Sequence, residues 1–256
     1  MFGKNCVIKV MTLNLLTDCG ASGANSFDKR ILRVVDMINT EMPDIIGFQE
    51  VTDRMRKKLC EVLVGYTLQG CGRDADCHGE AMTVAYRTDV FELLALENIW
   101  LSPTPGIPGS RFKGDQSLCP RMLTSLRLKH RFIDRPFRFI NTHFDHVGSS
   151  ARCLEAAELS QVISLYKDKF ILTGDFNATP DTPEIDLILS SLEQRNIIDC
   201  TKDIKASFHG LGKIENHKID YIFTDGSCKK AYAVEDVPVD GTYFSDHNPL
   251  CAEITL

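Results

Sequence analysis

Apolar strands that end in polar residues constrain this chain more than any other feature of its sequence. The clearest case is the run from Phe170 to Leu172, which leads into Gly174-Asp175-Phe176-Asn177. Side chains two apart on an extended strand point the same way, so we expect Asp175 and Asn177 to face the rim of a sheet together. Such a carboxylate and amide can orient a water or hydroxyl beside an anionic centre. An Asp-x-Asn turn is also ordinary loop chemistry, so both interpretations stay open for this motif alone.

Five other apolar strands carry or meet a polar residue. They are Leu13-Asn14-Leu15, Phe48-Gln49-Glu50-Val51, Asn141-Thr142-His143, Ile219-Asp220-Tyr221-Ile222-Phe223 and Ser245-Asp246-His247. Taken singly, most have plain alternatives: a turn at Asn14, a helix start at Glu50, a core histidine at His143 or a surface turn at Asp246. Asp220 differs, because a charge among apolar neighbours is costly to bury unless it is paired. Six such segments are hard to explain as separate turns, so we expect them to meet at one site.

Glu50, Asp175 and Asp246 are three of the carboxylates among these polar residues. If the fold brings them together, they repel one another unless a cation lies among them. A set of oxygen ligands without cysteine favours Mg²⁺, Mn²⁺ or Ca²⁺ over zinc. The sequence therefore predicts a site for a hard divalent cation.

Strand and helix patterns are mixed along the whole chain. A helix is predicted after Ser26, with Ile31, Val34, Val35 and Ile38 on its inward stripe. Residues 81–86 and 90–97 are predicted to pair as strands, and the Pro- and Gly-rich residues 101–121 to form a long loop. Each amphipathic helix needs a sheet face to cover. We therefore predict a single α/β domain over residues 1–256, built from two packed sheets with outer helices.

Composition limits the function classes and the location. The net charge is −6 and the pI about 5.7, so no global basic field would attract nucleic acid. No apolar run approaches the roughly 20 residues that span a bilayer. The first residues lack a signal-peptide core and are predicted to lead into the first strand. We expect a cytoplasmic monomer whose ten cysteines are reduced thiols.

In their order along the chain, the six segments resemble the endonuclease/exonuclease/phosphatase superfamily, which has the deoxyribonuclease I-like fold. The resemblance implies a four-layer α-β-β-α sandwich of two mixed sheets and hydrolysis of a phosphoester with Mg²⁺ or Mn²⁺ as the cofactor. It also implies a role for each motif residue. Glu50 is the principal metal ligand, Asn14 lies beside it as a metal or phosphate contact, and Asp246 is a ligand on the opposite side. Asp175 and Asn177 position water and phosphate. Asp220 orients His247, and His143 contacts the phosphate or leaving group.

The chain departs from one branch of this superfamily. Members that cut at abasic sites tend to carry an acidic residue where this chain has Leu15-Leu16. This favours the phosphatase, phosphodiesterase and deadenylase-like branches. The segments His143 to Arg152 and Ser207-Phe208-His209-Gly210 resemble a bacterial-type subgroup of uncertain substrate.

Three further residues are predicted to bind substrate: Arg152, His209 and Arg121. Arg152 follows the His143 loop and is able to clamp a phosphate bidentately. The alternatives are a solvated helix charge at Arg152, a packed turn at His209 and an ordinary strand-edge charge at Arg121.

The first predicted function is a metal-dependent phosphoesterase that acts on a phosphodiester or phosphomonoester. Its partner is a phosphate-ester substrate, including a nucleotide or nucleic acid. A nuclease is the second interpretation, and a lipid phosphodiesterase the third, although no membrane-binding helix is visible. A non-catalytic interaction module on the same fold should have lost some of Glu50, Asp175, Asp246 and His247, and all four are present.

Overall fold

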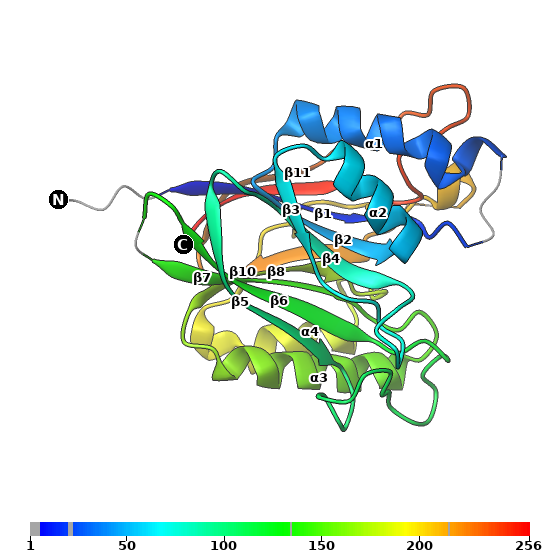
Figure 1. Ribbon diagram of the computed structural model, residues 1–256. Helices are drawn as coiled ribbons and strands as arrows, with labels where there is room; N and C mark the ends of the chain where they lie inside the picture. The colour runs from blue at the N-terminus through cyan, green and yellow to red at the C-terminus, as the bar shows by residue number, and fades with distance from the viewer. Residues whose placement is uncertain (1–5, 20–22, 134, 215) are drawn as a thin grey trace.

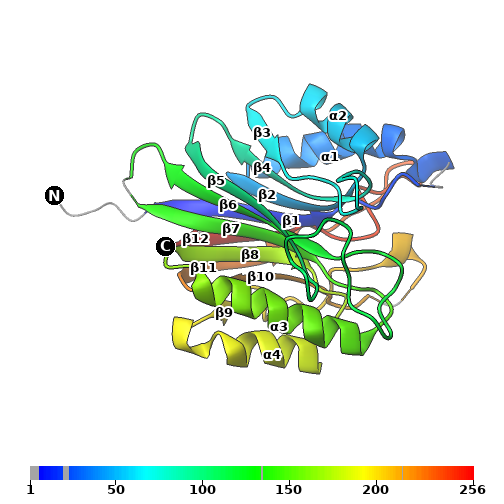
Figure 2. The same ribbon diagram turned by 60° about the horizontal axis from the view of Figure 1, so that its bottom comes forward.

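The computed structural model describes residues 6–19, 23–133, 135–214 and 216–256. Two six-stranded sheets lie face to face, and pairs of helices cover their outer faces (Figures 1 and 2). This architecture is the predicted four-layer α-β-β-α sandwich. Residues 1–5, expected to lead into the first strand, lie outside the described residues.

The first sheet has the order β11-β12-β1-β2-β4-β3. Its strands are β1 (Val7–Asn14), β2 (Ile45–Val51), β3 (Tyr66–Gln69), β4 (Ala81–Arg87), β11 (Ser227–Ala233) and β12 (Leu250–Thr255). β1 and β2 are parallel, so Asn14 and Glu50 lie at the same edge of the sheet. β12 is antiparallel to β1 and pairs Leu250 with Thr12, so its first residue also lies near that edge.

The second sheet has the order β5-β6-β7-β8-β10-β9. Its strands are β5 (Phe91–Trp100), β6 (Met122–His130), β7 (Pro136–His143), β8 (Lys169–Asp175), β9 (Ile198–Asp199) and β10 (Asp220–Thr224). β7 and β8 are parallel, with His143 in register with Asp175. β10 is antiparallel to β8 and places Asp220 opposite Asp175. The polar ends of three adjacent strands therefore meet at one edge.

Side-chain alternation along the strands produces three cores. In β8, Phe170 and Leu172 pack under the helices α3 (Ser149–Leu165) and α4 (Pro183–Ser191), while Ile171 faces the other sheet. In β1, Met11 packs under α1 (Phe27–Glu41) and α2 (Asp53–Val62), while Val10 faces the other sheet. The central strands β1, β2, β8 and β10 are buried on both faces, which explains their long apolar runs.

Two predictions about local structure are wrong. Residues 81–86 and 90–97 do not pair, because β4 hydrogen-bonds β2 and β3 while β5 hydrogen-bonds β6 in the other sheet. The short turn at Thr88–Val90 carries the chain between sheets, and apolar alternation alone does not distinguish this crossing from a hairpin. The sequence also predicts that Ser149 or Ser150 caps a helix, but α3 is capped at Gly148, and the Asp115 carboxylate accepts the N–H groups of Ser150 and Ala151.

The predicted long loop is confirmed, since turns and bends connect β5 to β6. No helix in the described ranges is long and apolar enough to cross a membrane. All ten cysteines fall within those ranges, and each is a free thiol.

Candidate active site

The polar strand ends of both sheets converge on one cleft with a volume of about 510 Å³. Six residues with a predicted catalytic or metal-binding role line it: Glu50, His143, Asp175, Asn177, Asp246 and His247. Two more, Asn14 and Asp220, are buried and hydrogen-bond side chains of the cleft lining. The fold therefore brings together all eight residues for which the sequence predicted a catalytic or metal-binding role.

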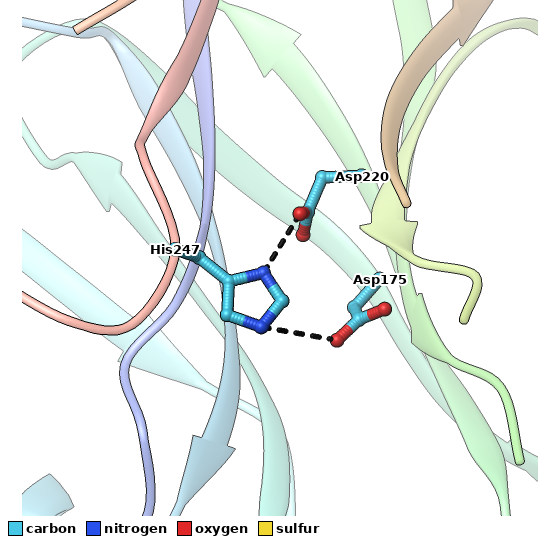
Figure 3. A group of neighbouring side chains, drawn as sticks. All are labelled: Asp175, Asp220 and His247. Carbon is cyan, nitrogen blue, oxygen red and sulfur yellow. Dashed lines mark hydrogen bonds and ion pairs between the residues drawn. The ribbon is translucent and has the colours of Figure 1, made fainter. Parts of the chain in front are cut away.

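His247 lies between two aspartates (Figure 3). Its Nδ1 is 2.8 Å from Asp220 Oδ2, and its Nε2 is 3.7 Å from Asp175 Oδ2. Burial by itself lowers the pKa of His247, but the charge and hydrogen bond of Asp220, then Asp175 and Asp246, outweigh burial and raise it. The imidazole is therefore held in one orientation as a cation. Asp220, buried among apolar residues, has the paired partner that its position in the sequence required.

Asp175 is the centre of the hydrogen-bond network. Its Oδ2 accepts from Asn14 Nδ2 at 3.0 Å, and its Oδ1 accepts from the Asn177 backbone N–H at 2.9 Å. Burial raises the pKa of Asp175, and the nearby charge of Asp220 raises it further. Asp175 and Asn177 do lie together, but the prediction that both are on one extended strand is wrong. β8 ends at Asp175, and Asn177 is in the left-handed region with φ 48°. A turn closed by the aspartate brings them together.

The second histidine of the site, His143, lies beside the Asn177 side chain. Asn177 Nδ2 is 3.1 Å from His143 Nε2 and donates to the Phe144 carbonyl at 3.0 Å. Burial lowers the pKa of His143 well below its ordinary value, and the positive charges of Arg121 and Arg73 lower it further. His143 is therefore a neutral imidazole, in contrast to His247.

Glu50 is positioned by a bulge at the end of β2. The register with β4 shifts between Phe48 and Val51, and Glu50 has φ 60°, a conformation that L-residues adopt only with strain. Its Oε1 accepts from Asn14 Nδ2 at 3.0 Å, and its Oε2 accepts from the Thr17 N–H at 2.7 Å. Glu50 thus belongs to the strand and turns into the cleft, rather than starting the following helix.

Asp246 completes a group of three carboxylates with Glu50 and Asp175. Burial raises the pKa of Asp246, and the charge of Glu50 raises it as well, although His247 opposes both. Its Oδ1 accepts from the Ser245 hydroxyl at 3.2 Å. The site therefore concentrates negative charge in a partly enclosed cleft.

The three predicted substrate-binding residues differ in their placement. Arg121 lines the cleft, with its Nη2 2.8 Å from His146 Nδ1. His209 is buried beside the cleft, where its Nδ1 accepts from the Gly212 N–H. Arg152 is not among the residues that line the cleft; it bonds the Glu184 carboxylate at 3.0 Å and the Asp145 carbonyl at 3.2 Å, tying α3 to α4.

Sequence reasoning missed several residues of the cleft and its support. Thr17, Arg73, Glu80 and His146 line the cleft without a predicted role. His146 lies in the segment from His143 to Arg152 that we singled out, whereas the other three belong to no such segment. Ser207 accepts the N–H groups of both Ile219 and Asp220 at 3.0 Å, which anchors the strand that carries Asp220. The nearby Ser207-Phe208-His209-Gly210 resemblance was a signal for this segment, and Phe208 packs against His247 with ring centroids 4.7 Å apart.

Two facing mixed sheets with this strand-end cleft define a deoxyribonuclease I-like α/β sandwich. The chain belongs to the Endonuclease/Exonuclease/phosphatase family, whose family model matches residues 11–247. Members of this family are typically hydrolases. The resemblance drawn from the six motif segments is thereby confirmed.

Solved structures of bacterial family members are similar to this chain over nearly its full length. An endonuclease/exonuclease/phosphatase from Bacteroides vulgatus has a TM-score of 0.89 at 28% identity, covering 98% of this chain and 99% of that one. A mannosyl-6-phosphatase from Bacteroides thetaiotaomicron has a TM-score of 0.84 at 26% identity, covering 97% and 100%. The human Nocturnin catalytic domain, at 20% identity and TM-score 0.74 over 99% and 96%, shares the fold. No curated protein matches the chain.

Proposed function

We propose that this protein is a divalent-metal-dependent phosphoesterase that hydrolyses a phosphomonoester or phosphodiester by attack of water on the phosphorus. One observation carries the proposal. A cationic His247, held by Asp220, faces Asp175 in the cleft that also contains Glu50 and Asp246. A positive donor, an acceptor and a set of oxygen ligands are the three parts that phosphoester hydrolysis requires.

The donor set of the cleft fits a hard divalent cation. Asp175 and Asp246 both have raised pKa values, because burial and neighbouring carboxylates disfavour their charged forms. A cation among the carboxylates removes this penalty, and oxygen ligands suit Mg²⁺ or Mn²⁺. When bound, such an ion supplies Lewis-acid stabilisation of a phosphate oxygen.

Two sets of side chains compete for the role of metal ligands. Ligand atoms of Asp175, Asp220 and His247 lie within 4.8 Å of one another. His247, however, is protonated in its ion pair with Asp220, and an imidazolium has no free lone pair for a metal. We therefore assign the cation to Glu50 and Asp246, with the Asn14 amide beside them, and keep Asp175 and His247 for proton transfer.

Asp175, His247 and His143 then have separate roles in the hydrolysis. Asp175, which accepts hydrogen bonds from Asn14 and Asn177, orients the attacking water and accepts its proton. His247 stabilises the charge that develops on the phosphate and donates a proton to the leaving oxygen. The neutral His143 contributes a polar contact to the phosphate.

The similarity to the Bacteroides thetaiotaomicron mannosyl-6-phosphatase supports a phosphomonoester among the substrates. A nuclease has less support. The chain carries a net charge of −6, and the lining of the cleft, among the described residues, includes two arginines and no lysine. Strand-binding clefts combine extended basic grooves with stacked aromatic side chains.

A panel of substrates tests the proposal. It comprises mannose 6-phosphate, a chromogenic phosphomonoester, a chromogenic phosphodiester, single-stranded RNA and plasmid DNA, each with Mg²⁺, Mn²⁺ or EDTA. We expect turnover of a phosphate ester with metal and none with EDTA. Glu50→Gln removes one ligand charge and should reduce turnover by about 10²-fold.

Glu92→Gln is the matched control, because Glu92 is an exposed glutamate of β5 outside the cleft. It should retain wild-type turnover. Turnover that survives EDTA, or a Glu50→Gln variant as active as Glu92→Gln, contradicts the metal assignment.

A further inference from the structure

One end of the cleft contains two buried arginines. Arg121 immediately precedes β6, and Arg73 lies in the loop before β4. Both line the cleft, yet Arg121 is 2% exposed and Arg73 is 8% exposed. Guanidinium groups are almost never buried to this degree unless they are paired, so their partners decide what this end of the cleft does.

Neither guanidinium is fully hydrogen-bonded. Arg73 Nη1, Arg121 Nε and Arg121 Nη1 are buried without a hydrogen-bond partner among the described residues. Arg73 uses Nη2 for Glu80 Oε2 at 2.7 Å, and Arg121 uses Nη2 for His146 Nδ1 at 2.8 Å. Each arginine therefore lines the cleft and has buried donor atoms without a hydrogen-bond partner.

The nearby acids form no hydrogen bond with these donors, although Asp145 and Arg121 form a long ion pair. Asp145 Oδ2 is 3.6 Å from Arg121 Nε, and the Asp145 carboxylate already accepts from Ser117, Val147 and Gly148. Glu155 accepts the Asp145 N–H, and burial raises the pKa of Glu155 to about 8, so it carries little charge at neutral pH. Burial, and then the like charge of Arg73, lowers the pKa of Arg121. An anion is the missing partner.

The strand order locates this anion site relative to the catalytic groups. β6 is the neighbour of β7, so Arg121 lies one strand beyond His143. Arg73 donates its backbone N–H to Glu80 beside β4, and the other neighbour of β4 is β2, so Arg73 lies two strand positions beyond Glu50. Neighbouring strands are about 5 Å apart. The backbones of Arg121 and Arg73 are thus displaced by about 5 and 10 Å from the strand ends that carry His143 and Glu50. Two phosphates that share a short linker span a distance in this range.

We infer that Arg73 and Arg121 form a subsite for a second phosphate of the substrate, so that the enzyme prefers phosphate esters bearing another phosphate a few bonds from the scissile one. This inference rests on the proposed function for the position of the scissile phosphate. The forked guanidinium donors match phosphate oxygens in geometry as well as charge.

A tryptophan beside this subsite allows ligand binding to be followed by fluorescence. Trp100 is the only tryptophan in the sequence, and its Nε1 donates to the Arg73 carbonyl at 2.7 Å. Tryptophan fluorescence and calorimetry should follow titrations of propanediol bisphosphate and propyl phosphate, with EDTA and with Mg²⁺. These binding measurements need no turnover, so their result is independent of whether the substrate panel reveals hydrolysis.

For the wild-type protein we expect the bisphosphate to bind at least about 10-fold more tightly than the monophosphate. Arg121→Gln and Arg73→Gln should each bring this ratio close to one, and Arg121→Lys should give an intermediate ratio because it keeps the charge without the fork. Arg127→Gln is the control, since Arg127 pairs with Asp168 on the outside of β6.

Three results overturn the inference. The first is equal binding of the two ligands by the wild-type protein. The second is the absence of a saturable response to the bisphosphate in both media. The third is an undiminished preference in folded Arg73→Gln protein, whose substitution disturbs one ion pair and is the safer variant if Arg121→Gln unfolds.

Discussion

At the scale of single residues, the two histidines of the cleft are held in opposite charge states. His247 is cationic because Asp220 binds its Nδ1, whereas His143 is neutral because it is buried near two arginines. Identical side chains thus have different roles that are set by their neighbours. Only the charged histidine is equipped to donate a proton to a leaving group.

Asp220→Asn tests this division of roles. The substitution keeps the size of the side chain at the buried position but removes the charge that holds His247 as a cation. We expect turnover to fall by at least about 10²-fold, to the level of His247→Ala, because a positioned acid contributes that much. Steady-state kinetics on the best substrate of the panel provides the measurement.

Thermal unfolding of Asp220→Asn and His247→Ala shows whether each variant is folded. The double variant should be no slower than the slower single variant, because both substitutions disable the same unit. Multiplicative losses in the double variant would argue that the two residues act separately.

At the scale of elements, α1 secures the loops that carry the site. Arg30 is fully buried, and its guanidinium donates to the carbonyls of Leu15 and Leu16 after β1 and of Phe244 before β12. One side chain therefore joins the Asn14 loop to the Asp246 loop. Burial lowers the pKa of Arg30 to about 10, which still leaves it charged at neutral pH.

Arg30→Met should uncouple these loops. The methionine fills part of the space but leaves buried carbonyls without donors, which costs about 2–4 kcal/mol of unfolding free energy. Urea denaturation measures this loss. Turnover should fall with it, because the Asn14 and Asp246 loops, which carry proposed metal ligands, are no longer held together by Arg30. Arg127→Gln, which breaks a partly exposed ion pair, should cost less than about 1 kcal/mol. Equal stability losses in the two variants would refute the bracing role.

At the scale of the whole molecule, the candidate active site lies on the seam between the two sheets, which is the line where their polar strand ends meet. Asn14, Glu50 and His247 belong to the side of the first sheet, and His143 and Asp175 to the second. The hydrogen bond from Asn14 to Asp175 crosses the seam directly. The site therefore exists only when both halves are packed together.

Packing of α3 against the second sheet also makes stability depend on pH. Glu155 in α3 is fully buried, and burial raises its pKa from 4.5 to about 8 despite the hydrogen bond from the Asp145 N–H. The unfolded chain releases this proton near pH 4.5 and the folded chain only near pH 8. Folding stability from this group is therefore complete below about pH 4.5 and is lost as the pH rises toward 8.

Glu155→Gln should remove this pH dependence, because the amide stays neutral and its oxygen still accepts the Asp145 N–H. Urea unfolding at pH 5, 7 and 9 should show the variant close to wild type at the lowest pH. At the highest pH it should be more stable by about 2–4 kcal/mol. Glu193→Gln, at an exposed position, should track the wild type throughout. A constant difference between Glu155→Gln and wild type across this range would show that Glu155 is charged in the folded protein.

Local sequence was sufficient for the layers and for the motif residues. Continuous apolar runs such as Phe170 to Leu172 identify strands, because a strand that is buried on both faces carries apolar residues at successive positions. Carboxylates and imidazoles interrupt those runs, so the candidate site residues Glu50, Asp220 and His247 were visible as exceptions. The six segments also follow one another along the chain as the motifs of a known family do, and the model of that family matches residues 11–247.

Tertiary structure alone decided which strands are neighbours and which loop arginines reach the cleft. Strand pairing depends on contacts between distant segments, and local periodicity is the same whether Ala81–Arg87 pairs with the next strand or with another sheet. Arg73 and Arg121 resemble ordinary loop and strand-edge charges in the sequence, whereas Arg152, similar in appearance, bonds Glu184. Burial distinguishes them, because only a buried guanidinium with unused donors requires an anion, and burial is a property of the assembled fold.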